Sequence, residues 1–192
     1  MPLTASLGVR MSIHLQPIGE EDEPFLFNVY ASTRAEELAL TGWSQAKQEA
    51  FLRMQYDAQR RSYRMQFPKA EYWVIHSDDR AAGRLIVERT AAEIHLIDIA
   101  LLPEHRGVGI GTTVLTRVME QARQADQSVR LRVERFNRAL HWYQRLGFAK
   151  TGDCGLHVEM LWRPGEGVPV AGAADGLGQT PQPWGKGACR SL

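Results

Sequence analysis

Hydrophobic and polar positions follow two different periods along this chain, and the changes of period mark the elements that we expect. A period of two is typical of half-buried strands, and a period near 3.6 is typical of amphipathic helices. The predicted strands are 13–18, 72–76, 83–88, 93–102, 129–134 and one or two more between 148 and 162. The predicted helices begin near residues 20, 43, 112 and 137, and Pro68 and Gly147 end the second and the fourth. The run at 93–102 is the most apolar of the strands, so we expect it to lie centrally in a sheet.

The distribution of these elements predicts one folded domain over residues 13–163. A chain of 192 residues can bury a continuous core without disulfides or metals. Residues 1–12 precede the first strand and are interpreted as an N-terminal extension. Beyond residue 163 Gly, Pro and Ala dominate, with too few large apolar side chains to offset the entropy of ordering. We therefore predict a disordered tail over 164–192.

Charge and cysteine content narrow the class of protein. The net charge is +1 and the pI about 7.9, with Arg mixed among Glu and Asp, which argues against a nucleic-acid partner. Cys154 and Cys189 are too few for a disulfide framework, and Cys154 with His157 is an isolated pair, so no metal site is predicted. No run approaches the roughly 20 apolar residues of a membrane span. We expect a cytoplasmic protein with no membrane partner.

The strongest chemical signal is the glycine-rich segment Arg106-Gly107-Val108-Gly109-Ile110-Gly111, placed between a strand and a helix. Bare amides at a helix N-terminus, together with the helix dipole, form an anion site, which would suit a phosphate. A P-loop is excluded because Gly111 is followed by Thr112 and not by a lysine. A Rossmann loop fits poorly, because the glycines do not follow the Gly-x-Gly-x-x-Gly pattern. Taken alone, the segment could also be a tight turn with no ligand.

A second segment makes the loop more specific. Asn137, Ala139, Tyr143 and the run Leu146-Gly147-Phe148 follow the glycine loop in the chain. Together the two segments resemble the signatures of the GNAT family of N-acetyltransferases, over roughly residues 13–162. The resemblance implies an α/β (α+β) fold with a mixed central sheet of six to seven strands, flanked by about four helices. It also implies that two central strands splay apart, so that a ligand can hydrogen-bond to their edges.

The resemblance further implies that acetyl-CoA is the cosubstrate. Backbone groups of the glycine loop and of the strand before it would hold pantetheine and pyrophosphate, and Asn137 would contact the pantetheine arm. The implied donor-binding residues are Leu101, Arg106, Gly107, Val108, Gly109, Ile110, Gly111, Thr112 and Asn137. The side chain of Arg106 would matter less than its backbone.

Three residues are candidates for proton transfer. The resemblance places Tyr143 near the departing thiolate as a general acid, and its reference pKa of about 10 keeps it protonated at neutral pH. The alternative is an aromatic core residue. An attacking amine needs a base or a water relay, for which Asp98 in the central strand and Glu134 at the end of the next strand are candidates. Each of these acids could equally be an ordinary hydrogen-bonded or solvated side chain.

These observations predict an acetyl-CoA-dependent N-acetyltransferase, in which an amine attacks the acetyl thioester directly in a ternary complex. A catalytically silent GNAT-like module that binds or senses coenzyme A is the alternative. The acceptor would be an amine of a small molecule or a peptide, but the segments 33–43 and 148–162, where specificity is expected, carry no recognisable acceptor motif. The sequence is compatible with a monomer and with a homodimer.

Overall fold

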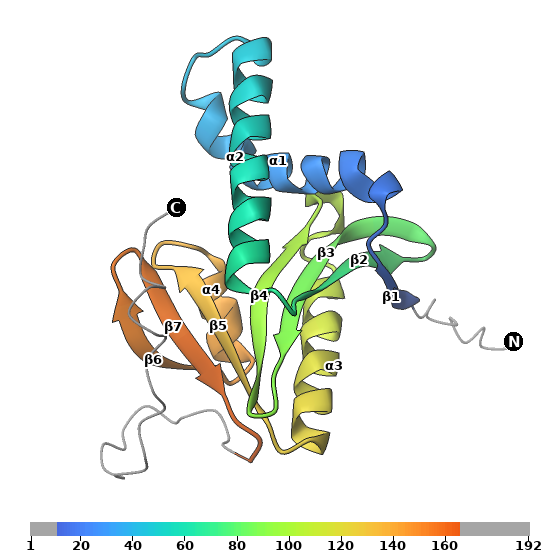
Figure 1. Cartoon of the computed structure of the whole chain (residues 1–192), viewed down its shortest axis with the longest axis vertical. Helices are drawn as coiled ribbons and strands as arrows, with labels where there is room; N and C mark the ends of the chain where they lie inside the picture. Colours follow the sequence, from blue (N-terminus) through green and yellow to red (C-terminus); the bar gives the residue numbers. More distant parts are fainter. Residues whose placement is uncertain (1–10, 166–192) are drawn as a thin grey trace, which may run out of the picture.

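The computed structural model describes residues 11–165, which form one seven-stranded sheet with helices on both faces (Figure 1). The strands are β1 (Ile13–Pro17), β2 (Glu71–Ser77), β3 (Arg80–Arg89), β4 (Glu93–Leu101), β5 (Ser128–Glu134), β6 (Ala149–Cys154) and β7 (His157–Trp162). The α-helices are α1 (Glu23–Ala39), α2 (Gln45–Gln66), α3 (Ile110–Gln124) and α4 (Ala139–Arg145), with short 3-10 turns at η1 (Glu20–Asp22) and η2 (Pro103–His105). The predicted extension 1–12 and tail 164–192 lie almost wholly outside the described residues.

The predicted elements are confirmed in type and order, and the sheet order β1-β2-β3-β4-β5-β7-β6 confirms a mixed sheet. The β2–β3 hairpin turns at Asp78 and Asp79, whose φ angles of 48° and 61° belong to the left-handed region that such turns require. The second helix begins at Gln45, two residues later than expected. Ser44 precedes it, and its Oγ accepts a hydrogen bond from the Lys47 amide at 3.4 Å.

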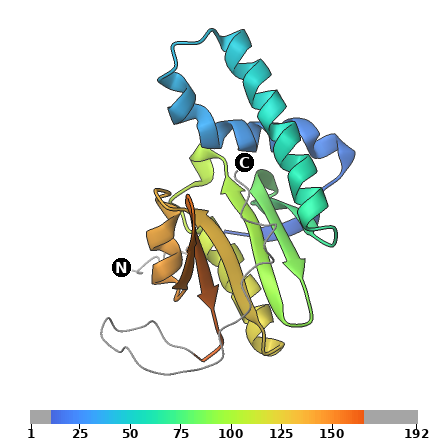
Figure 2. The ribbon, with the colours of Figure 1, turned by 60° about the vertical axis from the view of Figure 1, so that its left-hand side comes forward.

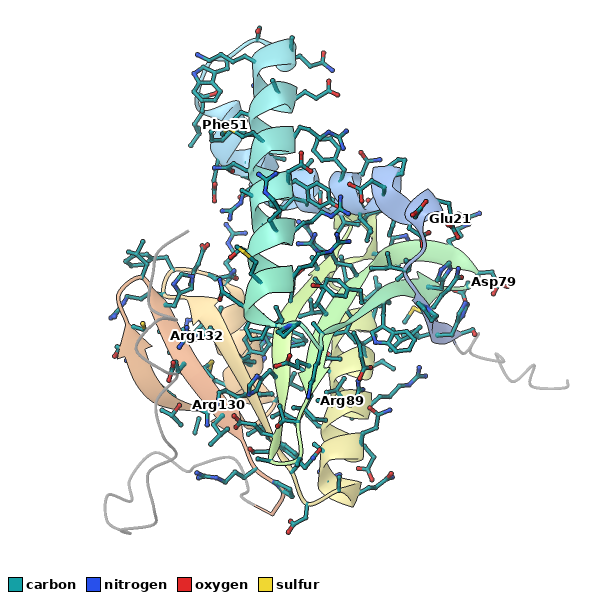
Figure 3. All side chains as sticks on the ribbon, viewed as in Figure 1. Glu21, Phe51, Asp79, Arg89, Arg130 and Arg132 are labelled. Carbon is teal, nitrogen blue, oxygen red and sulfur yellow. The ribbon has the colours of Figure 1, made fainter. Side chains whose placement is uncertain are left out.

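The helices divide the core between the two faces of the sheet. On one face α3 contributes the apolar stripe that was predicted, and it packs against side chains from β2 to β5. On the other face α1 and α2 cross the sheet, with a smaller cluster of Leu26, Phe27, Tyr30 and Tyr56 between them. Figures 1 and 2 show the α1–α2 connection projecting beyond the sheet. Phe51 lies in this projecting part (Figure 3), where its ring meets that of Trp43 at 5.2 Å between centroids.

The sheet is incomplete along the seam between β4 and β5. The two strands are parallel, and they pair only between Glu93–Leu96 and Ser128–Leu131. Beyond these residues they diverge, as Figure 2 shows. At the paired end Arg130 of β5, labelled in Figure 3, reaches across to Glu93 of β4, with 3.0 Å between Nε and Oε2. The splayed central strands that the resemblance implied are therefore present, and residues 97–101 keep an edge that β5 does not cover.

A β-bulge in β4 reverses the side-chain alternation just before this open edge. On β3, Val87 pairs with Leu96 but the preceding Ile86 pairs with Asp98, so that β4 has one extra residue at this point. Leu96 packs in the core beneath α3, and strict alternation would place Asp98 there too. Because of the extra residue, Asp98 lies instead on the face covered by α1 and α2, while Ile99 returns to the α3 core.

Candidate active site

The glycine loop is built from backbone conformations that side chains disfavour. Gly107 and Gly109 have φ angles of 76° and 95°, in the left-handed region. Gly109 is the N-cap of α3, which begins at Ile110, two residues earlier than the sequence predicted. A Cβ at Gly107 or Gly109 would meet no atom within 4 Å, so these glycines are required for their conformation and not for space.

The loop presents a row of free backbone amides. The first hydrogen bond at the start of α3 is donated by the Thr113 amide to the Gly109 carbonyl at 2.9 Å. Within residues 11–165, no acceptor faces the amides from Gly107 to Thr112. These N–H groups lie at the positive end of the α3 dipole, and the combination suits a phosphate or pyrophosphate.

The side chain of Arg106 is engaged elsewhere in the protein and does not extend the row of free amides. Its Nε donates to the Leu101 carbonyl at 2.8 Å, and its Nη2 donates to the Ser32 hydroxyl at 3.0 Å. The guanidinium therefore ties the loop to the end of β4 and to α1. This arrangement agrees with the expectation that the backbone of Arg106 matters more than its side chain for a ligand.

Helix α4 closes the loop from the other side of the seam. Trp142 donates a hydrogen bond from Nε1 to the Thr112 hydroxyl at 3.1 Å, and its ring lies 3.5 Å from the position of a Cβ on Gly111. Asn137 stands at the start of this helix, where its Oδ1 accepts the Ala139 amide at 2.8 Å. The Asn137 oxygen is thus engaged within the protein, and only its amide nitrogen is left for a ligand. Trp142 was missed in the sequence because nothing in the local pattern distinguishes it from a core aromatic residue.

Tyr143 is buried behind the seam, with 7% of its surface exposed. Its ring lies against those of Trp142 and Phe148, with centroids 4.8 and 5.7 Å away. Burial raises the pKa of its hydroxyl well above the usual range, and the negative charge of Asp98 raises it further. The hydroxyl has no hydrogen-bond partner in the part of the chain that the structure describes. It is therefore protonated at neutral pH and free to donate.

Asp98 is the carboxylate whose charge acts on the Tyr143 hydroxyl. Its Oδ2 accepts a hydrogen bond from Nε of Arg84 at 2.5 Å, and Arg84 in turn donates to Oε1 of Gln59 on α2 at 2.9 Å. The Arg84 side chain is 6% exposed and that of Asp98 19%. Burial is the largest single influence on the pKa of Arg84 and by itself would lower it, but the charge of Asp98, its hydrogen bond and the nearby tyrosines together outweigh burial, and the net shift is upward. Oδ2 of Asp98 is therefore paired with Arg84, and within residues 11–165 Oδ1 has no hydrogen bond.

Arg84 and Tyr63 were not among the predicted site residues. Arg84 is hydrogen-bonded to Asp98, and the charge of Asp98 acts on Tyr63. Tyr63 comes from α2, and burial followed by the charge of Asp98 raises the pKa of its hydroxyl above the usual range. A charged residue inside the otherwise apolar strand 81–87 was the signal for Arg84. No comparable signal marked Tyr63, because its role depends on where α2 crosses the sheet (Figure 1).

Glu134 is placed differently from Asp98. It ends β5 with its side chain 52% exposed, and its Oε1 lies 3.9 Å from Nη2 of Arg34 on α1. Burial by itself would lower the pKa of Arg34, but Glu37 and Glu134 oppose this and the net shift is upward. The two predicted acids therefore do not form one paired site. Asp98 is sheltered between elements, whereas Glu134 borders solvent at the open end of the seam.

Neither a metal cluster nor a membrane segment is found in residues 11–165. No three side chains of His, Cys, Asp or Glu gather there in a way that could hold a metal ion. None of the helices in this range has both the length and the apolar character needed to cross a membrane.

Comparisons with known proteins agree with this geometry. Residues 68–150, which include the glycine loop and the segment around Tyr143, match the family model described as "Acetyltransferase (GNAT) domain". No curated protein matches the chain significantly.

Many solved structures share the fold. The PaiA N-acetyltransferase of Thermoplasma acidophilum in complex with coenzyme A is 21% identical, with a TM-score of 0.61 over 80% of this chain and 99% of that chain. An acetyltransferase of Thermus thermophilus is 21% identical, with a TM-score of 0.58 over 79% of this chain and 97% of that one. A GNAT acetyltransferase of Elizabethkingia anophelis with acetyl-CoA bound is 13% identical, with a TM-score of 0.50 over 79% and 97%.

The family model and the fold lead to the same assignment as the two sequence segments. The matched region includes the strands that splay, the loop of free amides and the buried Tyr143, whose pKa is raised by burial and by the charge of Asp98. Residues 68–150 therefore match a GNAT acetyltransferase domain, and the described residues share the fold of solved GNAT acetyltransferases.

Proposed function

We propose that this protein is an acetyl-CoA-dependent N-acetyltransferase that acetylates a primary amine by direct attack in a ternary complex. The observation that carries the proposal is the row of free amides from Gly107 to Thr112, placed next to the uncovered edge of β4. Two proteins of the same fold, from T. acidophilum and E. anophelis, are described with coenzyme A and acetyl-CoA, which supports the same donor here.

The residues present fit this donor. The amides from Gly107 to Thr112 can hold a pyrophosphate at the positive end of α3, since no protein acceptor competes for them in the described structure. The open edge of β4 up to Leu101 offers backbone groups to the amides of a pantetheine arm, in the manner of an added strand. The amide nitrogen of Asn137 can contact the same arm. When bound, acetyl-CoA supplies the acetyl thioester.

Tyr143 is proposed as the proton donor to the departing thiolate. Its raised pKa excludes it as a base near neutral pH, so the hydroxyl can act only by donating. The surrounding rings of Trp142 and Phe148 fix its position and exclude water from that side. The Tyr143 hydroxyl lacks a hydrogen-bond partner in the described structure but is not among its fully buried polar atoms, so a ligand atom can reach it and accept its hydrogen bond.

Asp98, and not Glu134, is proposed to receive the acceptor amine. Arg84 fixes the carboxylate through Oδ2, which leaves Oδ1 to accept a hydrogen bond from an ammonium or amine. Glu134 is half-exposed and faces the guanidinium of Arg34, so it is less suited to orient a substrate. Replacing Asp98 by Asn should therefore reduce kcat/KM for an amine at least about tenfold, whereas Glu134→Gln should change it less than about threefold.

The test begins with calorimetric titration of coenzyme A and acetyl-CoA into the purified protein. Thiol release is then followed across a panel of primary amines, for the protein and for the Asp98→Asn and Glu134→Gln variants. Absence of binding by either form of the coenzyme would refute the proposal. Tight binding without turnover on any amine would favour a module that senses coenzyme A.

A further inference from the structure

A cavity of about 250 Å³ lies on the α2 face of the sheet, between the helices α1 and α2 and the strands β2 and β3. Its walls include Glu23, Gln59, Tyr63, Arg64, Tyr72 and Arg84. It is slightly smaller than the roughly 300–1,000 Å³ of typical small-molecule sites. Its size suits a small molecule.

One end of the cavity adjoins Asp98. Arg84 and Tyr63 line the cavity, and both interact with the Asp98 carboxylate, the first through a hydrogen bond and the second through its charge. The Tyr63 hydroxyl has no hydrogen-bond partner among residues 11–165, and Oδ1 of Asp98 also lacks one. A carboxylate oxygen beside a free phenol oxygen offers two acceptors to the N–H groups of an ammonium.

The other end of the cavity has the opposite character. The hydroxyl of Tyr72 is buried without a hydrogen-bond partner in the described structure. Burial raises its pKa, and the positive charges of Arg64 and Arg60 oppose that rise, so both guanidiniums act on this hydroxyl. Arg60 is already paired with Glu23, at 2.5 Å between Nη1 and Oε1. Arg64 forms no ion pair with any residue that the structure describes. The hydroxyl of Tyr72, a hydrogen-bond donor, therefore lies near a guanidinium whose charge no acid of the described structure compensates.

The sheet register gives the separation of the two ends. Tyr72 pairs with Ile86, and Ile86 pairs with Asp98, so the three residues form one row across β2, β3 and β4. Neighbouring strands are about 4.8 Å apart, which places the Cα atoms of Tyr72 and Asp98 about 10 Å from each other on the same face. A primary amine joined to a carboxylate by about two carbon atoms, as in 3-aminopropanoate, spans such a distance after a hydrogen bond of about 2.9 Å is allowed at each end.

We propose that this cavity is the acceptor site and that the acceptor is a small ω-amino carboxylate. Its ammonium binds at Asp98 and Tyr63, and its carboxylate binds at Arg64 and Tyr72. Of the acids near the carboxylate end, Glu23 is neutralised by Arg60 and Glu20 is exposed at the rim, while the charge of Glu88 acts on the Tyr72 hydroxyl more weakly than the charges of Arg64 and Arg60. The inference rests on the proposed acetyl transfer and names the class of acceptor for it.

Three probes with the same number of carbon atoms test the proposal: 3-aminopropanoate, propylamine and 1,3-diaminopropane. Acetylation is followed by thiol release at saturating acetyl-CoA, and binding of each probe to the protein with coenzyme A is measured by calorimetry. We expect KM and Kd for 3-aminopropanoate to be at least about tenfold lower than for propylamine, since charge-assisted hydrogen bonds add to the same alkyl chain. Equal or tighter binding of propylamine or of the diamine would overturn the proposal.

Two variants locate the preference, and a third serves as the control. Tyr72→Phe and Arg64→Gln should each raise KM for 3-aminopropanoate about tenfold and leave that for propylamine unchanged. Arg61→Gln removes an exposed arginine of the same helix that does not line the cavity, and it should alter neither value. If the preference survives both cavity variants, the carboxylate binds elsewhere and the proposal fails. Missing coenzyme A binding, or missing turnover of every amine, would instead count against the proposed function, while calorimetry of the probes still tests the cavity.

Discussion

Replacing Arg84 by Met removes one partner of a buried ion pair and leaves the other in place. The Arg84 and Asp98 side chains are 6% and 19% exposed, so the carboxylate that remains would be poorly hydrated. Removing one partner of a buried pair costs about 3–5 kcal/mol, and the partial exposure of Asp98 places this case near the lower figure. For a domain of this size, about 3 kcal/mol corresponds to a fall in Tm of about 6–12 °C.

The double replacement Arg84→Met with Asp98→Leu distinguishes a desolvated charge from lost packing. Both charges are then absent, and apolar side chains of similar volume fill the space, which is often neutral for stability. We expect the double variant to lie within about 1.5 kcal/mol of the parent, although each single variant loses about 3 kcal/mol. The difference is a coupling free energy that additive effects cannot produce.

Urea unfolding at pH 7, followed by circular dichroism, measures all four proteins of this cycle. Coenzyme A binding checks that the loss is local, since the glycine loop is formed by other residues and should retain its affinity. If Arg84→Met costs less than about 1 kcal/mol, the pair behaves like an exposed salt bridge, and the argument from burial is wrong.

Three further predictions concern other parts of the molecule. Tyr143→Phe should lower kcat about 10²–10⁴-fold without weakening acetyl-CoA binding, as single-turnover and calorimetric measurements would show; a change within twofold would exclude a general acid at this position. Gly109→Ala should weaken coenzyme A binding at least about fivefold, because the φ of 95° at this position is strained for alanine. Gly111→Ala is the control and should bind coenzyme A as the parent does, because Gly111 has an ordinary φ and a Cβ there would meet its nearest neighbour at 3.5 Å. Similar coenzyme A affinities of the two variants would refute the role of the loop conformation. The pKa of Glu93 is lowered from 4.5 to about 2, mainly by its hydrogen bond with His95, so its contribution to stability is complete above about pH 5 and is lost as the pH falls toward 2. Glu93→Gln should flatten the loss of stability in that range, and an unchanged pH profile would contradict the assignment.

Local patterns were sufficient for the elements and for the position of the glycine loop, because both depend on residues close together in the chain. The α3 stripe and the glycines before it are contiguous, and the helix boundary was displaced only from Thr112 to Ile110. The prediction that two central strands splay apart came from the family resemblance and not from a local pattern. No periodicity in the two strands shows that their pairing stops at Leu96 and Leu131.

The acceptor side of the site could not be predicted in the same way. Asp98 is joined to Arg84 of the neighbouring strand and lies under Tyr63 of a helix 35 positions earlier in the chain. These contacts depend on strand register and on the path of α2, neither of which leaves a local signal. A strict period of two would also have placed Asp98 on the wrong face of the sheet, because the bulge shifts the register by one residue.

The bulge gives β4 an unusual relationship to insertion and deletion. Substitution of Ile97 by another apolar residue preserves the length of the strand, and so preserves the face on which Asp98 lies. Deletion of Ile97 would place Asp98 directly after Leu96, so strict alternation alone would direct the carboxylate to the face of α1 and α2 and return Ile99 to the layer beneath α3. The face on which the carboxylate lies therefore tolerates loss of the extra residue, and a strand that is one residue shorter could keep the chemistry of this site.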